Sequence, residues 1–503
     1  MSIASVSNRW LNRLYKILAI MVVCLAVIIS ASRLLLPYVE DYRQDFQNYI
    51  NKKNQTNMII GGLGMNWQGS GPALIANKVT LIDTDDAYVF IEHLEIQIDF
   101  WATITTQQLI ASNVTIEGSI VNVDQSTWNS DTADNNTQQT PNQSNENKST
   151  NGFQQVSDIF LNRINRFSSQ SSQVTIRNGS LERSFHVNNL NWLNKGVRHQ
   201  AQGDIIVNKL SSNNIRLKID MSGSSVDELD GLMYLEANHL DITPWLDSVL
   251  VVENDNTNAD VGFSAWLKVK SGDAERLQVS LHENFISWQA EGKAHNLMLS
   301  EGQILLVKGQ QQASFQLYST PLLLQFNTQE KQEYIVQMNK NAQDFSIYLS
   351  TFDLALISQV SPLFIEEKKM RELMSELSIS GQANEIYFRK KAGEINALAN
   401  FTDTSTQYSQ NIPGVLNLNG QLSYAQQNLN LDLSASNGEI DFSQHFVAPI
   451  PYNSFNAIVD LSILDDGWKL QAKDIAVSSS ELNLTADITI DSLSEAETTM
   501  SLL

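Results

Sequence analysis

Residues 214–221 read NIRLKIDM, and in this stretch apolar side chains at Ile215, Leu217, Ile219 and Met221 alternate with polar ones. Alternation with a period of two puts the apolar side chains on one face of an extended strand and the polar ones on the other. An α-helix would repeat its apolar positions every three or four residues instead. The stretch therefore predicts a strand with one face turned away from water.

The same alternation recurs in later segments of the chain. Their apolar positions are Leu277, Val279 and Leu281; Leu429, Leu431 and Leu433; and Leu482, Leu484, Ala486, Ile488 and Ile490. Each run ends near Gly, Asn, Asp or Ser, which are turn-forming residues. Because few helix-length connections separate the runs, we expect antiparallel hairpins and meanders.

Helical patterns are few, and two of them carry start signals. Thr243-Pro244 and Ser361-Pro362 each place a hydroxyl residue at the N-cap and proline at the first helical position. The second signal precedes an amphipathic run that ends at Leu377. Short turns are predicted at glycines between strand-like runs, namely Gly118, Gly179, Gly203, Gly381 and Gly420.

Composition excludes several function classes. The chain has 503 residues, and 42% of them are hydrophobic, which is enough to bury a core. Its 33 Lys and Arg against 55 Asp and Glu give a net charge of -22, which argues against a nucleic-acid partner. The same charge repels an anionic bilayer surface, so membrane contact must depend on an anchor or an apolar surface. Cys24 is the only cysteine, which excludes a disulfide framework.

Residues 17–36 read ILAIMVVCLAVIISASRLLL, which predicts a transmembrane helix. Their number suffices to cross about 30 Å of hydrocarbon, and Arg33 lies close enough to the end to reach the headgroups. The predicted anchor side chains are Ile17, Leu18, Val22, Val23, Leu25, Val27, Ile28, Leu34, Leu35 and Leu36.

The charges beside this segment predict its orientation. Arg9, Arg13 and Lys16 precede it without an acidic residue among them, so the positive-inside rule places the N-terminus in the cytoplasm. The alternative is a cleaved signal peptide, because residues 30–32 resemble a cleavage site. The apolar run continues past that triplet to Leu36, which favours a retained anchor.

The remaining chain is expected to divide by composition. Residues 1–16 form the cytoplasmic tail and 37–52 an amphipathic helix, with Tyr38, Tyr42, Phe46 and Ile50 at a spacing of four. Residues 53–124 form a first β segment. Residues 125–152 are rich in Asn, Gln, Ser and Thr and predict a disordered linker. Residues 153–503 form a repeated β body that we expect to continue beyond this chain.

Two architectures accommodate these strands. One is a set of closed sandwiches in which each sheet hides its apolar face against another. The other is an elongated, curled antiparallel sheet whose apolar inner face stays open as a groove for acyl chains. In the second case the lipid-contacting side chains would be Ile215, Leu217, Ile219, Leu277, Val279, Leu281, Leu429, Leu431, Leu433, Leu482, Leu484 and Ile488.

No motif in the sequence predicts an enzyme, a cofactor or a metal site. His282-Glu283 could open a zinc-binding HExxH motif, but Ile286 takes the place of the second histidine. The sequence lacks the GxxxxGK[ST] phosphate loop and the GxSxG nucleophile elbow. A hydrolase on a β scaffold is therefore disfavoured.

Several blocks resemble the YhdP family of AsmA-like proteins. The N-terminal one is Trp67-Gln68-Gly69 with Gly71-Pro72 and then ALIANKVTLID, shortly after the apolar segment. Later blocks follow in the family's order: HLDITPWL at 239–246, VGFSAWLKV at 261–269, IPGVLNLNGQL at 412–422, PIPYNSF at 449–455 and DDGWKLQAKDIAV at 465–477.

This resemblance implies an inner-membrane protein whose periplasmic β-groove, of the taco-like form, carries phospholipid toward the outer membrane. TamB and the chorein-type transporters of eukaryotes share this bridge-like arrangement. Its implied partners are phospholipid acyl chains, the inner membrane and outer-membrane components. A different reading is an anchored periplasmic scaffold that assists assembly of outer-membrane proteins, with sheet edges or the groove receiving polypeptide.

Overall fold

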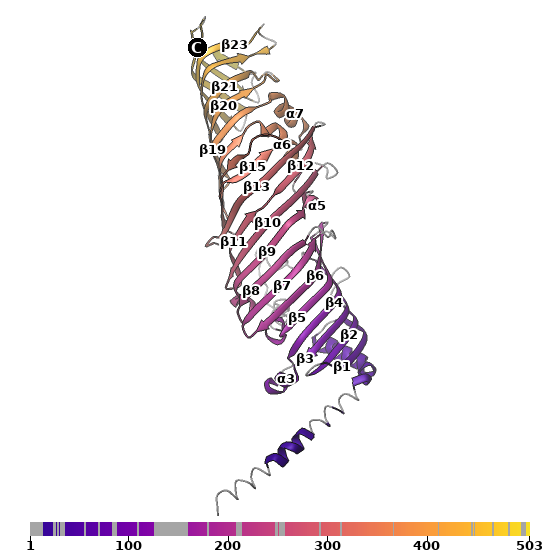
Figure 1. Ribbon diagram of the computed structural model, residues 1–503. Helices are drawn as coiled ribbons and strands as arrows, with labels where there is room; N and C mark the ends of the chain where they lie inside the picture. Colours follow the sequence, from indigo (N-terminus) through magenta and orange to yellow (C-terminus); the bar gives the residue numbers. More distant parts are fainter. Residues whose placement is uncertain are drawn as a thin grey trace, which may run out of the picture. The chain divides into compact units, whose positions relative to one another are not determined.

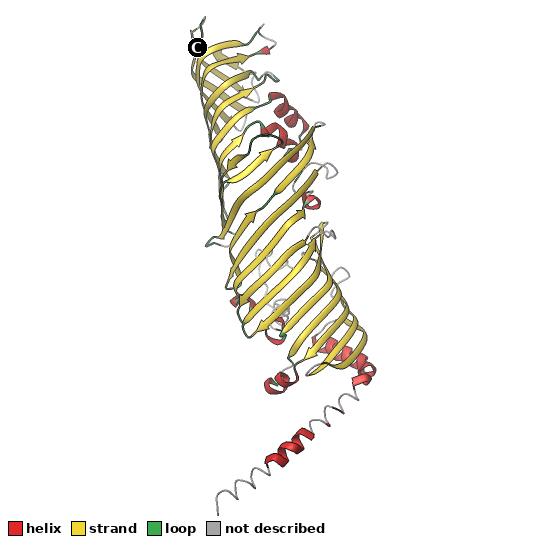
Figure 2. Ribbon diagram, viewed as in Figure 1, coloured by secondary structure: helices red, strands yellow, loops and turns green. Residues whose placement is uncertain are grey.

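Strands dominate the part of the chain that the structure describes (Figure 2). The computed structural model describes residues 14–23, 27, 30, 36–54, 57–68, 71–82, 88–107, 110–124, 159–178, 181–207, 214–246, 250, 257–290, 293–311, 314–365, 367–410, 412–443, 446, 448–464, 467–480, 483–493 and 499–502. They form 26 strands and a few short helices. The mainly β fold class predicted from the alternation is thus confirmed.

The chain divides into two compact units. Unit 1 comprises Met1–Tyr234 with Val269–Asp273, and unit 2 comprises Leu235–Lys268 with Ala274–Leu503. Strand β9 (Asp230–Asp241) carries the chain from one unit into the other.

Unit 1 opens with two consecutive helices and continues as strands that lie side by side in chain order (Figure 1). The helices are η1 (Leu36–Tyr42) and α2 (Arg43–Asn54). The strands are β1 (Met58–Gln68), β2 (Gly71–Ile82), β3 (Tyr88–Ile98), β4 (Ala111–Asp124), β5 (Arg166–Asn178), β6 (Leu181–Lys195), β7 (Arg198–Val207) and β8 (Asn214–Ser222). Short helices α3 (Phe100–Thr106), η3 (Ile159–Arg163) and η4 (Val226–Glu228) lie between or after them.

Each of these strands pairs with the next in antiparallel fashion, except that β4 and β5 are parallel. A parallel pair needs a long connection that brings the chain back to the end where it started. The predicted linker 125–152 lies between these two strands and outside the described residues. At this pair the expectation of hairpins and meanders is therefore wrong.

Unit 2 is a longer antiparallel sheet that curls toward its C-terminal strands (Figure 1). After α5 (Thr243–Leu246) its strands are β10 (Thr257–Lys270), β11 (Asp273–Leu281), β12 (Asn284–Ala290), β13 (Lys293–Lys308), β14 (Phe315–Ser319), β15 (Leu322–Phe326), β16 (Gln332–Tyr334), β17 (Val336–Lys340), β18 (Asp344–Asp353), β19 (Ser380–Lys391), β20 (Glu394–Thr406), β21 (Gly414–Ala425), β22 (Asn428–Asp441), β23 (Ile450–Leu464), β24 (Gly467–Ser478), β25 (Asn483–Leu493) and β26 (Thr499–Leu502). From β17 onward each strand pairs with its successor.

Two helices, α6 (Leu356–Phe364) and α7 (Lys368–Leu377), interrupt the strands of unit 2. The predicted helix start at Ser361-Pro362 is wrong, because Pro362 lies inside α6 near its end. Proline has no N–H to donate to the carbonyl four residues earlier. The Ser361 hydroxyl donates to that Ser358 carbonyl at 3.2 Å instead, so the helix tolerates the proline.

Most of the predicted glycine turns are wrong as well, since Gly118, Gly203, Gly381 and Gly420 lie inside strands; Gly179 lies outside the described residues. A Cβ built on Gly420 would stand 2.1 Å from the Asp432 carbonyl oxygen on the next strand. Such a glycine lets a neighbouring backbone approach more closely than any side chain permits. These positions therefore mark tight strand contacts and not chain reversals.

Candidate functional site

The strand register of unit 2 aligns apolar side chains into a continuous row across twelve strands. Directly paired residues point to the same face of a sheet, so a chain of pairings traces one line on that face. The members of this row, here the unit 2 apolar row, are Leu277, Leu306, Leu317, Met338, Ile347, Phe388, Ala397, Tyr424, Leu429, Leu461, Leu470 and Ile490. With strands ~4.8 Å apart the row extends for roughly 50 Å along the sheet.

The adjacent row on the opposite face of the same strands is mostly polar. The residues one position away pair in the same manner, and only Val307 and Ala425 among them are apolar. This unit 2 polar row consists of Arg276, Val307, Gln316, Asn339, Ser346, Arg389, Asn396, Ala425, Asn428, Ser462, Lys469 and Asp491. Across these twelve strands the sheet of unit 2 thus has an apolar row on one face and a mostly polar row on the other, although Tyr318, Tyr387 and Leu398 also lie on the second face.

Unit 1 carries a similar line, the unit 1 apolar row, across its eight strands. Its members are Met65, Leu74, Ile96, Val114, Phe167, Trp192, Ala201 and Ile219. The parallel pairing of β4 with β5 keeps Val114 opposite Phe167, so the row crosses it without a break.

The members of the unit 2 apolar row are neither buried nor fully exposed, and each of the twelve is partly accessible to solvent. A cluster covered by helix α6 provides the contrast. In unit 2, Trp288 is only 2% exposed under α6, where its indole N–H donates to the Gln359 carbonyl at 3.2 Å. Trp288 packs there with Phe326, Leu356 and Leu363. The apolar row has no comparable burial, so its side chains remain accessible to a hydrophobic guest.

Most of the predicted lipid-contacting residues lie on these faces. Ile219, Leu277 and Leu429 belong to the apolar rows themselves. The flanking ones pair with apolar residues or glycine: Ile215 with Ile205, Leu217 with Gly203, Val279 with Ile304, Leu281 with Gly302, Leu431 with Val459, Leu433 with Ala457 and Ile488 with Ala472. Leu484 pairs with Val477 and is 45% exposed. Leu482 lies outside the described residues.

The predicted membrane anchor is described only in part. Residues 14–23 are helical, and their apolar side chains are more than half exposed. Among the anchor and orientation residues, Arg9, Arg13, Leu25, Ile28, Leu34 and Leu35 lie outside the described residues, whereas Lys16, Ile17, Leu18, Val22, Val23 and Val27 are helical and Leu36 begins η1. Within the described ranges, no single helix combines the length and apolar character that crossing a membrane requires.

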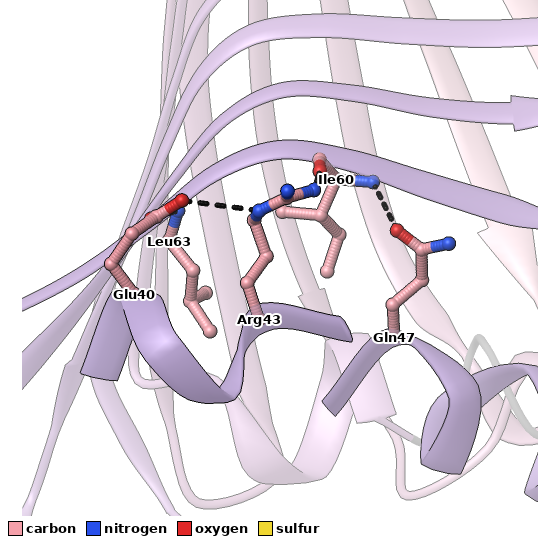
Figure 3. A network of polar contacts seen from close by, with 5 residues as sticks. All are labelled: Glu40, Arg43, Gln47, Ile60 and Leu63. Carbon is pink, nitrogen blue, oxygen red and sulfur yellow. Dashed lines mark hydrogen bonds and ion pairs between the residues drawn. The ribbon is translucent and has the colours of Figure 1, made fainter. Parts of the chain in front are cut away.

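The helices after this segment hold the free edge of β1 with four polar side chains, and Figure 3 shows three of them, Glu40, Arg43 and Gln47. Arg43 donates to the Ile60 carbonyl at 2.6 Å, and Gln47 accepts from the Ile60 N–H at 3.0 Å. Glu40 accepts from the Leu63 N–H at 2.6 Å. Asn51 both accepts from the Met58 N–H and donates to its carbonyl, each at 2.8 Å. These side chains replace the neighbouring strand that an edge strand lacks.

Sequence reasoning missed this clamp, here the set Glu40, Arg43, Gln47 and Asn51. Phe46 of the predicted series packs on the apolar cluster of β1–β3, together with Val39, which the series did not include. Tyr38 and Tyr42 are 61% and 65% exposed, so their prediction as an apolar helix face is wrong. A 3₁₀-helix has three residues per turn, and a spacing of four does not stay on one side of it. The sequence signal for the clamp is the spacing of its four polar residues, which lie three or four positions apart and so share one side of the two helices.

Ion pairs lie on the polar faces of the sheets of both units. Arg389 pairs with Asp344 across β18 and β19, and its hydrogen bond holds the pKa of the Asp344 carboxyl below the ordinary value. Arg198 and Asp220 pair likewise at 2.6 Å, and the hydrogen bond from Arg198 lowers the pKa of Asp220. Arg198 and Asp220 are about half exposed, whereas Arg389 and Asp344 are 38% and 21% exposed, and ion pairs that water reaches add little stability. They keep this side of each sheet solvated.

The described residues offer no metal centre, since they contain no group of three His, Cys, Asp or Glu side chains that could hold an ion. The candidate site is the surface that the unit 2 apolar row forms. An apolar surface of this length suits a guest with long hydrocarbon chains.

Comparisons with known proteins agree with this surface. The chain is 20% identical over 478 residues to the intermembrane phospholipid transporter YhdP of Escherichia coli (strain K12). The alignment covers 92% of this chain and 37% of that protein, so the chain spans little more than a third of its relative. The role named for that relative is transport, which is non-enzymatic. No solved structure matches the chain significantly. The family model described as YhdP protein matches residues 1–503, and the chain therefore belongs to the YhdP family.

Proposed function

We propose that this chain carries phospholipid, without covalent chemistry, along the apolar faces of its two units from the inner toward the outer membrane. In this proposal residues 17–36 span the inner membrane, the N-terminus is cytoplasmic and the remainder lies in the periplasm. Acyl chains contact the apolar rows while headgroups stay in water. The observation that carries the proposal is the unbroken, partly exposed unit 2 apolar row.

Physical chemistry favours acyl chains as the guest. Burying apolar surface contributes about 25 cal/mol per Å², so a partly exposed apolar row is stabilised when hydrocarbon covers it. The row contains no charged residue that would select one headgroup. We therefore expect binding to depend on the acyl chains more than on the headgroup.

The path begins beyond the clamp. Val39 and Phe46 occupy the apolar face near Ile60, Leu63 and Leu74, where they take the place that an acyl chain would fill. Lipid contacts are thus expected from β4 onward in unit 1 and along β11–β25 in unit 2. The name of the relative, intermembrane phospholipid transporter, supports the same role, because transport between membranes requires a lipid to leave one bilayer and reach another.

Photocrosslinking from matched positions tests the proposal. A photoreactive amino acid at Leu431, which faces the apolar side, should capture phospholipid in membranes, whereas the same group at the adjacent, exposed Asp432 should not. Mass spectrometry identifies the adducts. Equal phospholipid yields at both positions would contradict the proposal.

The same experiment distinguishes lipid transport from the hypothesis of a scaffold for outer-membrane protein assembly. If the chain assisted assembly of outer-membrane proteins, Leu431 would capture polypeptide in preference to phospholipid. The clamp on β1 argues against strand addition at that edge, because the Ile60 and Leu63 groups already have partners.

A further inference from the structure

Helix α3 presents two large apolar side chains to solvent. Trp101 and Ile104 are each 55% exposed, and a separation of three residues puts them on one face of the helix. Phe100 secures α3 to the sheet, with its ring centroid 6.3 Å from that of Trp67 at the end of β1. Trp101 meets the Phe100 ring edge-on at 5.3 Å. The exposed face is therefore held on a packed base.

The polar groups of α3 are satisfied within the helix and its flanks. The Asp99 carboxylate accepts from the Ala102 N–H at 2.9 Å, and the Thr103 hydroxyl accepts from the Ile110 N–H at 3.1 Å. The hydroxyls of Thr105 and Thr106 donate to helix carbonyls. The sequence of the helix, FWATITT, contains no charge. Such a segment loses little when water is withdrawn from it.

Helix α3 lies at the same end of the unit 1 sheet as the point where the apolar segment 17–36 joins that unit. Glu40 contacts Leu63 while Asn51 contacts Met58, so the helices run antiparallel to β1 and begin toward Trp67. Trp67 in turn contacts Phe100, and Figure 1 shows α3 beside the ends of β1 and β3. The point where residues 17–36 join unit 1 and the exposed face of α3 thus share one end of the sheet.

We propose that α3 is a second bilayer contact, with Trp101 and Ile104 entering the interface of the membrane that residues 17–36 cross. The inference rests on the proposed function, which places that segment in the inner membrane. Tryptophan prefers the boundary between hydrocarbon and water. Because the net charge of -22 opposes adsorption to an anionic surface, an uncharged apolar contact is the kind that this chain can make. In this proposal the exposed Tyr38 and Tyr42 on η1 lie in the same membrane interface as Trp101.

Depth-dependent fluorescence quenching tests this contact in the full chain. Trp101→Cys and Ile104→Cys are made in a Cys24→Ser background, labelled with an environment-sensitive fluorophore, and reconstituted into vesicles of phosphatidylethanolamine and phosphatidylglycerol. Lipids carrying a nitroxide near the headgroup should quench most of the fluorescence at both positions. Ile59→Cys is the matched control, because Ile59 is an apolar residue of unit 1 that is 48% exposed and lies near the start of β1, at the opposite end of that strand from Trp67.

Each outcome decides the inference. Quenching at 101 and 104 but not at 59 supports it, and quenching at 101 and 104 no greater than that at 59 overturns it. A label at 101 that is shielded from water yet unquenched by lipid would indicate a protein contact and would also overturn it. The photocrosslinker at Leu431, in parallel proteoliposomes, reports on the proposed function separately. Lipid captured there without quenching at 101 would reject the α3 contact alone, and the reverse result would reject the transport path alone.

Discussion

Tyr452 in β23 stabilises three neighbouring strands of unit 2 through one buried hydroxyl. Its phenol donates to the Leu416 carbonyl in β21 at 2.6 Å, passing over β22 between them. Gly438 in β22 makes this possible, because a Cβ there would stand 2.3 Å from the phenol oxygen. Burial raises the pKa of the Tyr452 phenol, so the group stays protonated and remains a donor throughout the neutral range.

Replacing this tyrosine should therefore cost stability. Tyr452→Phe leaves the Leu416 carbonyl without its donor, and we expect the free energy of unfolding to fall by about 1 kcal/mol. Urea denaturation at neutral pH measures the change. Tyr318→Phe is the control, since Tyr318 is 42% exposed and its hydroxyl reaches only a neighbouring Gln316 side chain. Equal effects of the two substitutions would refute the role assigned to the buried hydroxyl.

At the scale of an element, the η1–α2 segment acts as a substitute strand for β1. Exposed strand edges recruit other chains, and proteins commonly cover them. Here the cover is helical, and single side chains reach the backbone groups that a neighbouring strand would otherwise bind. The same segment packs Phe46 on the apolar face, so it closes both the edge and the first part of that face.

Gln47→Leu should open this edge. The Ile60 N–H loses its acceptor, and a loss of about 1 kcal/mol corresponds to roughly fivefold faster amide exchange. Hydrogen exchange of the β1 peptide, followed by mass spectrometry, measures the change. Gln44→Leu makes the same substitution on an exposed position of α2 and should leave exchange unaltered. Unchanged exchange in both variants would mean that packing alone holds the helices on β1.

At the scale of the whole molecule, a lipid transported along an apolar row passes the members of that row one after another. A lipid that passes along the unit 2 apolar row must meet its twelve strands in turn, from β11 through β13, β14 and β17 to β25. One unfavourable position should then stop passage as effectively as two. This distinguishes a conduit from a set of independent binding patches, where each substitution would remove only its own site.

Leu317→Asp tests the series arrangement. A carboxylate among acyl chains costs about 2.5–3.5 kcal/mol, so delivery of lipid to a photocrosslinker placed farther along at Ile490 should fall at least tenfold. Adding Leu429→Asp should reduce the yield little further. Gln316→Asp, on the exposed face of the same strand, is the control. Undiminished labelling at Ile490 with Leu317→Asp would show that lipid does not travel along this row.

Alternation along single strands made much of this surface predictable. Ile219, Leu277 and Leu429 lie on the apolar rows because a local period of two is a property of the strand itself. The Pro362, Gly203 and Gly420 predictions failed for a different reason. A proline is tolerated inside a helix when a nearby hydroxyl donates to the carbonyl that the proline leaves without a donor. A glycine is needed inside a strand when the backbone of the next strand lies too close for a side chain. Both conditions involve residues that a local pattern does not identify.

The sequence by itself determined the fold class, the amphipathic faces and the apolar segment at the N-terminus, because each follows from the order of polar and apolar residues over a short stretch. Only the tertiary structure decided which residues meet across strands, that β4 and β5 run parallel and that Glu40, Arg43, Gln47 and Asn51 cap β1. The physical reason is that pairing occurs through backbone N–H and C=O groups, which nearly every residue carries. Register is therefore selected by packing across the sheet, between residues far apart in the chain.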